Sequence, residues 1–438
     1  MIIHTVQKGD TVNSIAEQYN IPVSRLEKDN DLAPYSNLSI GQALMITYPA
    51  ETYIVKEGDT LESIAAANGI TRIDLLRNNP QLSGESSLTA GTELIIRFNN
   101  KEKQIYVNGF ANSFININIL RRTLPFLTYI TILNYKIQED GSLIDIPDED
   151  IIRVSREYGV APIMFISAFD IYGTENEETI HNLLNNSEAR LNLIQNTLNI
   201  LNSKNYYGLY LGFEHIAQED LQLYSDFVKN ITDSLNLEGY EVFVSLIPST
   251  FNYSPGSPGN EPYFAEIGQA ANYVTLLIYQ WMKSTISQYE NTGVYYLNEY
   301  ISYAVTQIPP EKIFLGLGRI AYDWAYPYSE EKASGDFISD YGALNLANQY
   351  NATIYLDTPS QAPYYYYTDL AGLEHFVWYK DARTVDAIVS LIFKYGLKGI
   401  AIWNVMYYFS PTFIVINSQY DIVSVLNSTE TVLRDSTP

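Results

Sequence analysis

Eight short apolar segments, separated by stretches with helical spacing, are the feature that most constrains the fold of this 438-residue chain. Each segment has the length of a buried strand, and the intervening stretches repeat apolar residues with helical periodicity. Eight such strand–helix units in succession predict an α/β fold with a (β/α)₈ barrel. The segments are residues 105–110, 129–135, 161–167, 208–214, 242–248, 273–279, 313–318 and 399–404.

The seventh and eighth segments are farther apart than one connecting helix requires. Between them, residues 353–355, 364–367 and 376–378 have the character of short strands. We therefore expect a small β-rich insertion packed over one side of the barrel mouth. If Tyr364–Tyr367 is a strand, only its alternate members can face the mouth.

The first hundred residues contain a tandem repeat. Residues Val6–Thr11 return as Val55–Thr60 at an offset of 49, and Leu26 returns as Leu75. Each copy has the pattern strand, helix, helix, strand, and the Asp or Thr of a shared Gly-Asp-Thr sequence can cap the first helix. The repeat predicts two small βααβ domains, residues 1–48 and 51–98, ahead of a barrel domain of residues 103–430.

Composition argues against several classes of protein. The net charge of −24 argues against nucleic acid as a partner, because phosphate binding needs clustered Lys and Arg, and it disfavours docking on anionic membranes. The chain has no cysteine, and its four histidines are not spaced as metal ligands, so we expect no metal and no cofactor. No apolar run approaches the roughly 20 residues of a membrane span. No signal peptide precedes the first repeat, so we expect synthesis in the cytoplasm.

The fourth segment ends in a single carboxylate. In a strand, Tyr210, Gly212 and Glu214 share one face, and that face points into the barrel mouth. Active sites of such barrels lie at the C-terminal ends of the strands. Glu214 therefore stands where a general acid would act.

Both repeats resemble the LysM module, a small domain that binds N-acetylglucosamine units of peptidoglycan and chitin. The resemblance implies a sugar groove between two loops of each copy, and two copies in tandem strengthen binding through effective concentration. We expect the loops, rather than the side chains of Asp10 and Asp59, to carry the binding. The groove positions are Gly9, Asp10, Thr11, Leu32, Ala33 and Pro34 in the first copy and Gly58, Asp59, Thr60, Gln81, Leu82 and Ser83 in the second.

The segment Tyr207–Glu214 resembles D-x-x-D-x-D-x-E, the signature strand of family-18 glycoside hydrolases. In that family the final Glu protonates the leaving oxygen, while the acetamide of the substrate attacks the anomeric carbon and the Asp two residues earlier orients it. The resemblance assigns the general acid to Glu214, and the Asp positions read Tyr207, Tyr210 and Gly212. Further blocks resemble the LysM-bearing spore cortex N-acetylglucosaminidases, at residues 312–318, 361–369, 377–383 and 396–403.

Other strand ends also depart from the family pattern. Tyr279-Gln280 replaces the usual Tyr-Asp or Tyr-Glu pair of the sixth strand, and Trp403 is expected to form the floor of the sugar cleft. The expected substrate-binding residues are Tyr210, Tyr279, Gln280 and Trp403. Loss of a positioned charge typically costs about 10²–10³ in rate. The pattern favours a pseudoenzyme that binds peptidoglycan or another N-acetylglucosamine glycan in the spore envelope or cell wall and has lost most or all hydrolytic activity.

Two alternatives remain open. The first is an active, retaining N-acetylglucosaminidase that cleaves spore-cortex peptidoglycan with Glu214 as general acid, in which Glu219 or Asp220 replaces the missing Asp. The second is a structural protein of a spore-envelope or surface assembly, which would self-assemble. In each case the absence of a signal peptide fits deposition on the spore from the mother cell.

Overall fold

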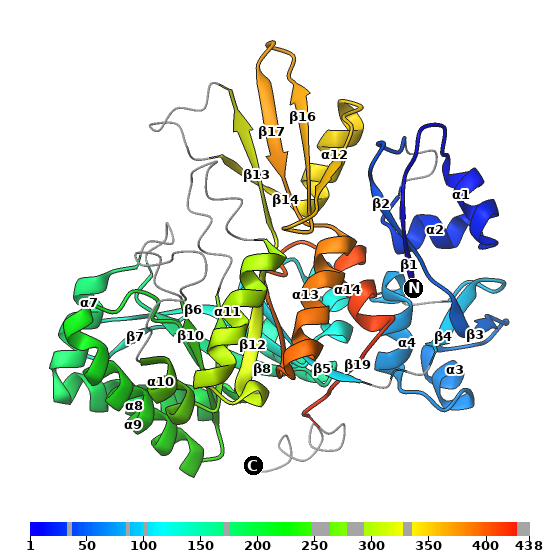
Figure 1. Ribbon diagram of the computed structural model, residues 1–438. Coiled ribbons are helices and arrows are strands. Elements are labelled where there is room, and N and C mark those ends of the chain that lie inside the picture. Colours follow the sequence, from blue (N-terminus) through cyan, green and yellow to red (C-terminus); the bar gives the residue numbers. More distant parts are fainter. Residues whose placement is uncertain are drawn as a thin grey trace.

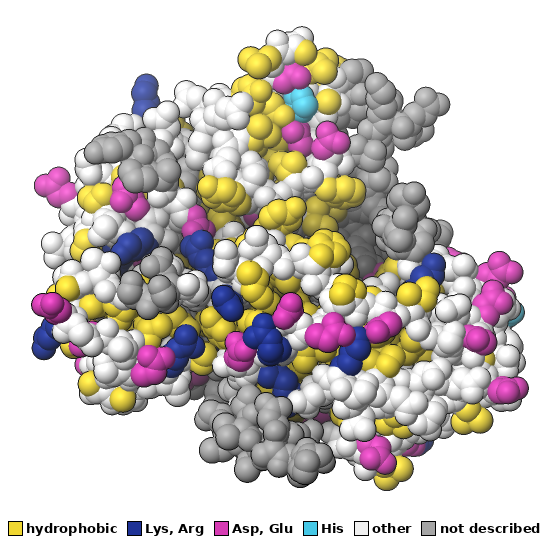
Figure 2. All heavy atoms as spheres, turned by 180° about the vertical axis from the view of Figure 1, so that it is seen from behind, with side chains coloured by type: hydrophobic (Ala, Val, Ile, Leu, Met, Phe, Trp, Pro, Cys, Tyr) yellow, Lys and Arg dark blue, Asp and Glu magenta, His cyan; other side chains and the backbone are white. Residues whose placement is uncertain are grey.

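The computed structural model shows a barrel with an insertion above it and the two N-terminal repeats at its side (Figure 1). No helix in the part of the chain that the structure describes is long and apolar enough to cross a bilayer. On the face seen in Figure 2, basic and acidic side chains are interspersed across the middle of the molecule. The residues that the structure describes are 1–32, 37–84, 88–99, 101, 103–169, 175–247, 263–277, 293–326 and 335–426.

Eight parallel strands close into the barrel that the sequence predicts. The ring is closed because β5 pairs with both β6 and β18, and every neighbouring pair around it is parallel. The predicted fold class is thus confirmed. In ring order the strands are β5 (Gln104–Asn112), β6 (Tyr129–Ile137), β8 (Ala161–Ser167), β9 (Gly208–Leu211), β10 (Glu241–Leu246), β11 (Tyr273–Leu276), β12 (Ile313–Gly318) and β18 (Gly399–Trp403).

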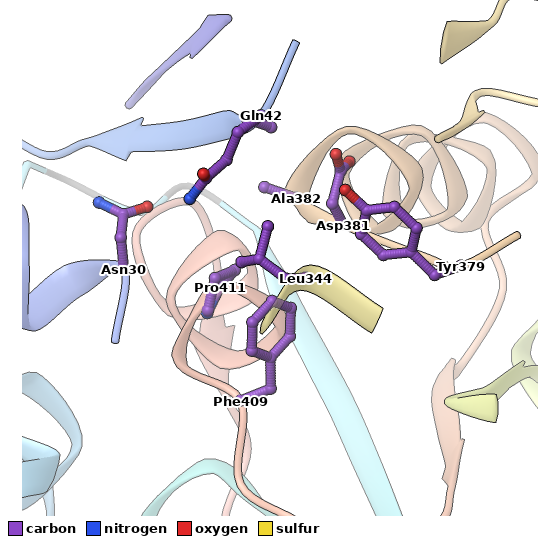
Figure 3. Close-up of a pocket in the computed structure, with 9 residues that line it drawn as sticks. Asn30, Gln42, Leu344, Tyr379, Asp381, Ala382, Phe409 and Pro411 are labelled. Atoms are coloured by element: carbon purple, nitrogen blue, oxygen red, sulfur yellow. The ribbon is translucent and has the colours of Figure 1, made fainter. Parts of the chain in front are cut away.

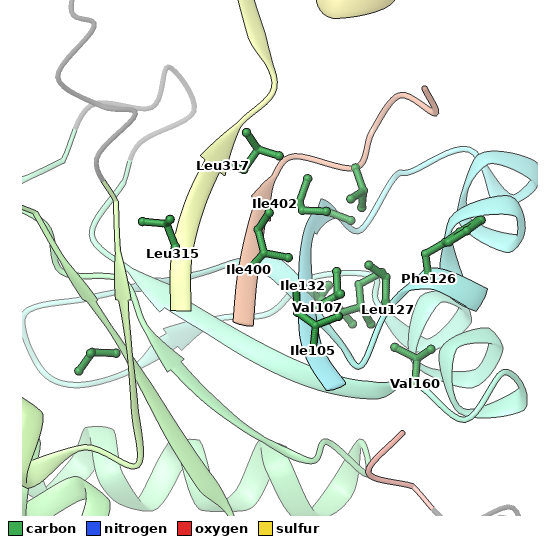
Figure 4. Packing of buried hydrophobic residues seen from close by; sticks show 14 of the residues in the cluster. Ile105, Val107, Phe126, Leu127, Ile132, Val160, Leu315, Leu317, Ile400 and Ile402 are labelled. Atoms are coloured by element: carbon green, nitrogen blue, oxygen red, sulfur yellow. The ribbon is translucent and has the colours of Figure 1, made fainter. Parts of the chain in front are cut away.

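Helices cover the outside of the barrel. Outward strand residues such as Ile105, Ile132 and Ile400 pack with residues of this outer layer into one continuous core (Figure 4). The outer helices are α5 (Ile117–Thr123), α6 (Glu149–Glu157), α7 (Glu177–Asn185), α8 (Ser187–Ser203), α9 (Leu221–Leu237), α10 (Tyr263–Ala270), α11 (Val294–Gln307), α13 (Ala382–Tyr395) and α14 (Ser410–Asn417). The short elements around the barrel are η2 (Leu124–Phe126), β7 (Leu143–Ile144), η3 (Gln218–Asp220), η7 (Pro310–Lys312) and β19 (Asp421–Ile422).

The inside of the barrel is filled by aromatic rings. The ring of Tyr210 lies 5.1 Å from that of Phe110 and 5.3 Å from that of Phe165, between centroids. Phe243 and Phe314 belong to the same buried cluster, with centroids 5.9 Å apart. The interior is therefore a packed core rather than a channel, as is usual for barrels of this size, and a ligand meets only its rim.

The insertion between β12 and β18 is rich in β-strands, as predicted, and the structure shows that they form an antiparallel sheet. Helix α12 (Asp340–Gln349) covers one face, where Tyr365 is buried and its hydroxyl donates to the carbonyl of Ala343. Tyr364 and Tyr366 alternate with Tyr365 and lie on the other face with Phe376. The strands are β13 (Ile320–Ala325), β14 (Asp336–Ser339), β15 (Tyr355–Asp357), β16 (Ala362–Thr368) and β17 (Glu374–Trp378).

The two repeats fold as βααβ modules, as predicted. A buried Asn at the same repeat position ties the second helix to the closing strand in each, because Asn30 exchanges two hydrogen bonds with the backbone of Met45, and Asn79 does the same with Ile95. The first module contains β1 (Ile2–Thr5), α1 (Val12–Tyr19), α2 (Val23–Asp29) and β2 (Ala43–Ile46). The second contains β3 (Pro49–Ile54), α3 (Leu61–Ala67), α4 (Arg72–Asn78), η1 (Pro80–Leu82) and β4 (Glu93–Phe98).

In the shared Gly-Asp-Thr turn, the Asp and the Thr side chains accept different hydrogen bonds. Thr11 caps α1 and Thr60 caps α3, each by accepting the backbone N–H of the Ser three residues later. The carboxylate of Asp10 accepts the N–H of Gln7 instead, and the equivalent Asp59 accepts that of Lys56. Of the two capping candidates the Thr is therefore the cap, because the Asp closes the turn before it.

Candidate functional site

Strand β9 ends earlier than predicted, at Leu211, and Glu214 follows at the barrel mouth. Phe213 faces outward, where its ring stacks on that of Phe227 in α9 at 6.4 Å, whereas Tyr210 faces the interior. Glu214 is half-buried, and its carboxylate lies near enough to the interior Tyr210 hydroxyl to affect it, which places Glu214 on the inner side. Burial raises the pKa of the Tyr210 hydroxyl, and the nearby Glu214 carboxylate raises it further.

A second carboxylate, that of Glu175, holds the backbone of Glu214. Its oxygens lie 3.0 and 3.1 Å from the amide nitrogen of Glu214 and 2.7 Å from that of His215. The strand ladder ends here because these N–H groups donate to a side chain rather than to the neighbouring strand. Hydrogen bonds to a carboxylate are strong, so Glu175 fixes the position of the Glu214 loop. Sequence reasoning missed Glu175, which stands 39 residues before Glu214 and belongs to no motif.

Gly212 lies under the ring of Phe165, which belongs to β8. A Cβ atom added at Gly212 would lie 2.1 Å from Cζ and 2.6 Å from Cε2 of that ring, far inside van der Waals contact. The space that a side chain at this position needs is therefore filled from the neighbouring strand. The sequence reveals the missing side chain but not the ring that replaces it.

Tyr210 is fully buried among the interior rings. Its hydroxyl oxygen lies 3.2 Å from Oγ of Ser245 on β10, so its polar end is also inside the barrel. This burial does not fit the expected substrate contact, and Tyr210 packs the core instead. Trp403, by contrast, ends β18 at the mouth, is partly exposed, and lies 5.1 Å from the ring of Phe110. Tyr279 and Gln280 lie outside the described residues.

Asp220, considered above as a replacement for the missing Asp, is directed away from the mouth. Its oxygens lie 2.7 Å from Nδ1 of His181 and 3.0 Å from Nδ2 of Asn185, both on α7. These contacts hold the carboxylate in the outer layer, so the geometry does not support this replacement. Glu219 beside it is exposed.

The predicted groove positions of the first module are only partly described. Gly9 and Thr11 are exposed and Asp10 is half-buried, so the first loop is open to a ligand. Leu32 in the opposite loop packs on the core of the module. Ala33 and Pro34 lie outside the described residues.

In the second module both predicted groove loops are described. Gly58 and Thr60 are exposed and Asp59 is half-buried, as in the first module. In the opposite loop Leu82 is buried, whereas Gln81 and Ser83 are partly exposed. The two loops therefore offer polar backbone and side-chain groups around one apolar residue.

The first module docks on the barrel through Asp31, which begins the loop after α2. Its carboxylate accepts the N–H and the hydroxyl of Ser410 at 2.6 and 2.8 Å, and one oxygen lies 3.1 Å from Nη2 of Arg122. Ser410 begins α14 and Arg122 belongs to α5. One acidic side chain thus connects the module to two outer elements of the barrel.

The end of the same loop docks on the insertion. Oδ1 of Asn348 in α12 accepts the hydroxyl of Ser39 at 2.8 Å, and the N–H of Ile354 donates to the carbonyl of Ile40 at 2.8 Å. Gly41 approaches so closely that an added Cβ would lie 1.8 Å from the carbonyl oxygen of Ile354. Only glycine permits this contact.

A small cavity with about 10 Å³ of space for water-sized molecules lies at this junction (Figure 3). Nε2 of Gln42 and the hydroxyl of Tyr379 are buried there, and neither has a hydrogen-bond partner among the described residues. A single water molecule fits such a volume. The cavity is therefore a joint between domains rather than a sugar site.

The second module is joined to the barrel by packing as well as by hydrogen bonds. Helix α4 and η1 pack on η2 and α5 of the barrel, and the guanidinium Nε of Arg77 donates to the carbonyl of Pro125. Nδ2 of Asn417 in α14 donates to Oδ1 of Asn78 at 2.9 Å. The apolar residues of the module belong to the same cluster as those of the outer barrel layer.

The geometry is that of a closed parallel barrel with an insertion after its seventh strand and a Glu at the mouth after its fourth, the class of (β/α)₈-barrel proteins. The chain belongs to the glycosyl hydrolases family 18, whose sequence model matches residues 114–407, and it carries two LysM domains, matched at residues 4–47 and 53–97. We call these LysM1 and LysM2.

Named relatives extend over nearly the whole chain. The chain is 28% identical to the "Cortical fragment-lytic enzyme" of Bacillus anthracis, over 92% of this chain and 94% of the relative. It is 27% identical to the "Putative sporulation-specific glycosylase YdhD" of Bacillus subtilis (strain 168), over 94% and 97%. The crystal structure of the Bacillus cereus spore cortex-lytic enzyme SleL matches with a TM-score of 0.78 and 26% identity, over 97% of this chain and 99% of that one.

Proposed function

We propose that this protein binds N-acetylglucosamine-containing peptidoglycan of the spore envelope through LysM1 and LysM2, and that its barrel hydrolyses this glycan weakly or not at all. The observation that carries the second part is the packing of Phe165 on Gly212. The substrate-assisted route needs a carboxylate at that place to orient the acetamide of the substrate and to stabilise the positive charge that develops. A glycine under a phenyl ring supplies neither.

The relatives support the location and the kind of glycan. One carries a name that refers to the spore cortex, one to cortical fragments and one to sporulation. The LysM domains supply the binding to N-acetylglucosamine polymers, and two copies on one chain increase the avidity for a polymer with repeated sites. A protein retained on the spore envelope through this glycan fits both observations.

A second candidate function is an active cortex-lytic N-acetylglucosaminidase with Glu214 as general acid. The printed name of the Bacillus anthracis relative favours it, as does the position of Glu214 at the mouth with its amide held by Glu175. In this case another group must orient the acetamide, because Gly212 has no side chain and Asp220 is engaged by α7.

The test is digestion of purified spore-cortex fragments by the full chain, with new reducing ends measured by mass spectrometry. The control variants are Glu214→Gln at the mouth and Glu219→Gln, which changes an exposed neighbour. Under our proposal all three proteins pellet with the glycan and release no product above background. Product from wild type and Glu219→Gln but not from Glu214→Gln would establish the second candidate instead.

Placing an Asp at position 212, where the family pattern has one, tests the role of Phe165 directly. Gly212→Asp alone places a side chain inside the Phe165 ring and should cost about 1–3 kcal/mol of stability by overpacking, without gain of activity. Gly212→Asp combined with Phe165→Ala opens the space and should raise hydrolysis above that of either single variant. Equal stability of Gly212→Asp and wild type in denaturant unfolding would show that the ring does not block this position.

A further inference from the structure

Two neighbouring loops at the barrel mouth each carry one strongly exposed aromatic side chain. Phe114, in the loop after β5, is 77% exposed, and Tyr407, in the loop after β18, is 61% exposed. Rings of this size normally contribute to a core, and an apolar ring left in water forgoes about 1.5–3 kcal/mol of burial. Loops at the C-terminal ends of the strands form the binding sites of such barrels, so two exposed rings on adjacent mouth loops make this surface a candidate binding site.

The loop that carries Phe114 connects the mouth to LysM2. It leaves β5 after Asn112 and enters α5 at Ile117. Helix α5 packs on η1, the predicted groove loop of LysM2, and Asn118 Oδ1 lies 3.9 Å from the place of a Cβ on Gly84. Phe114 therefore stands between the mouth and the groove loop of LysM2.

The loop that carries Tyr407 connects the mouth to LysM1. It leaves β18 after Trp403 and reaches α14 at Ser410, where Asp31 of LysM1 docks. Its backbone is held in place by the buried Arg319, whose Nη1 donates to the carbonyl of Tyr407 at 2.9 Å and whose own N–H donates to that of Trp403 at 2.6 Å. Tyr407 therefore stands between the mouth and LysM1.

The two loops lie side by side. Strands β5 and β18 are paired, the N–H of Val405 donates to the carbonyl of Phe110 at 2.9 Å, and the N–H of Asn112 lies 3.3 Å from the sulfur of Met406. The loops that carry the exposed rings consequently lie on the same side of the mouth, where β18 ends at Trp403. Aromatic rings offer flat apolar faces, and so do the C–H faces of pyranose rings, which makes a sugar strand a suitable occupant.

We propose that Phe114 and Tyr407 form an additional glycan-binding surface between the LysM modules and the barrel mouth, occupied by the same N-acetylglucosamine strand that the modules hold. This inference rests on the proposed glycan binding and extends it to residues outside the LysM grooves. It also explains the docking of both modules on the barrel. A glycan strand can be bound by the modules and this surface together only if the modules keep a fixed position relative to the mouth.

The test compares the affinity of the full chain for N-acetylglucosamine oligomers of about two and about six units by isothermal titration calorimetry. Phe114→Ala and Tyr407→Ala should each weaken binding of the long oligomer by about 2–10-fold, the double variant by more, and binding of the dimer should not change. Phe114→Tyr, which keeps a ring, should bind as wild type does. Leu370→Ala, at a 97% exposed position in the insertion, is the matched surface control.

The outcomes separate this inference from the function on which it rests. If wild type and the double variant bind the long oligomer equally, the surface between modules and mouth is refuted while LysM binding stands. If the variants lose affinity for the dimer as much as for the long oligomer, the rings do not lie along an extended strand and the inference fails. If wild type binds neither oligomer nor cortex glycan, both proposals are wrong. Both side chains are exposed, so the thermal unfolding of the variants should match that of wild type.

Discussion

LysM1 and LysM2 have the same fold, the same capped turn and the same buried asparagine, yet they are joined to the barrel in different ways. Most buried apolar residues of LysM1, among them Ile15, Leu26 and Leu44, form a cluster of their own, and only Met45 joins the cluster of the outer barrel layer. The core of LysM2, including the equivalent Leu75, is continuous with the outer layer of the barrel. LysM1 docks through directional hydrogen bonds from Asp31 and from residues 39–41, and through the packing of β2 on α13 and of α2 on α14. The two copies of one module are therefore attached differently: LysM1 keeps most of its core to itself, whereas LysM2 shares its core with the barrel.

The largest expected effect comes from the matched pair Leu26→Ala and Leu75→Ala. Both side chains are fully buried and occupy the same repeat position, so each truncation should cost about 2–5 kcal/mol. Leu26→Ala should produce an early unfolding step limited to LysM1, whereas Leu75→Ala should lower the main transition of the barrel. Calorimetry with hydrogen exchange measures both, and a single shared transition in the two variants would contradict the difference between the modules.

The next effect is a pH dependence confined to LysM1. Burial raises the pKa of Asp29 from 3.8 to about 6, against a hydrogen bond from Thr47 that lowers it. The folded state therefore binds the proton more tightly than the unfolded chain does, so this group favours folding below about pH 4 and loses that effect as the pH rises to 6. The change is on the order of 2–3 kcal/mol.

LysM2 provides the control for this prediction, because the residue equivalent to Asp29 is Asn78. Asp29→Asn keeps an acceptor for Thr47 and should stabilise LysM1 at pH 7 with no change at pH 4. Hydrogen exchange of α2 at the two pH values is the measurement. Equal pH dependence in wild type and variant would exclude Asp29 as its source.

A smaller effect is expected from substitution of a glycine that occupies the same position in both modules but contacts another domain only in LysM1. Gly41 and the equivalent Gly91 both have positive φ, at +85° and +87°, which costs most L-residues about 1–2 kcal/mol and costs Asn less. Only Gly41 touches a neighbouring domain, while Gly91 has nothing within 4 Å of an added Cβ. Gly41→Asn should release LysM1, with a larger radius in small-angle scattering and faster proteolysis of the junction. Gly91→Asn should leave the shape unchanged; a similar expansion in both variants would assign the effect to the turn rather than to docking.

The smallest effect concerns the ion pair between the modules, Arg25 with Glu93. Arg25→Gln should lower stability by about 1 kcal/mol or less, and by less again in high salt. Lys229→Gln, which breaks an exposed pair with Asp233 on α9, is the matched control. Thermal unfolding at two salt concentrations measures both, and a loss larger than that of Gly41→Asn would show that the modules depend on each other more than on the barrel.

Local periodicity predicts most of this fold. The eight barrel strands, the insertion and both βααβ modules follow from apolar patterns and from the repeat, because each pattern reflects contacts within one element. The end of β9 does not follow: residues 208–214 read as one strand, and the strand ends at Leu211. The reason is a side chain from another part of the chain, since Glu175 takes the N–H groups of Glu214 and His215.

The candidate site was predictable only in part for the same reason. Glu214 and Trp403 follow from the strand pattern and the family resemblance. The contact of the Phe165 ring with Gly212 depends on the register of β8 against β9. The direction of the Asp220 side chain depends on its hydrogen bond to His181 of α7. The docking of both modules likewise joins residues hundreds of positions apart, such as Asp31 with Ser410. A single sequence contains no signal for such pairs.

The last described strand has a practical consequence. β19 pairs with the start of β5, and Val425 and Leu426 then pack against the inner cluster of the barrel. The described chain thus departs from the floor of the barrel, on the side away from the mouth. A fluorophore or a surface linker joined at that end would leave the mouth and the module grooves facing outward. Single-molecule force measurements on cortex glycan need this orientation, and this attachment point provides it.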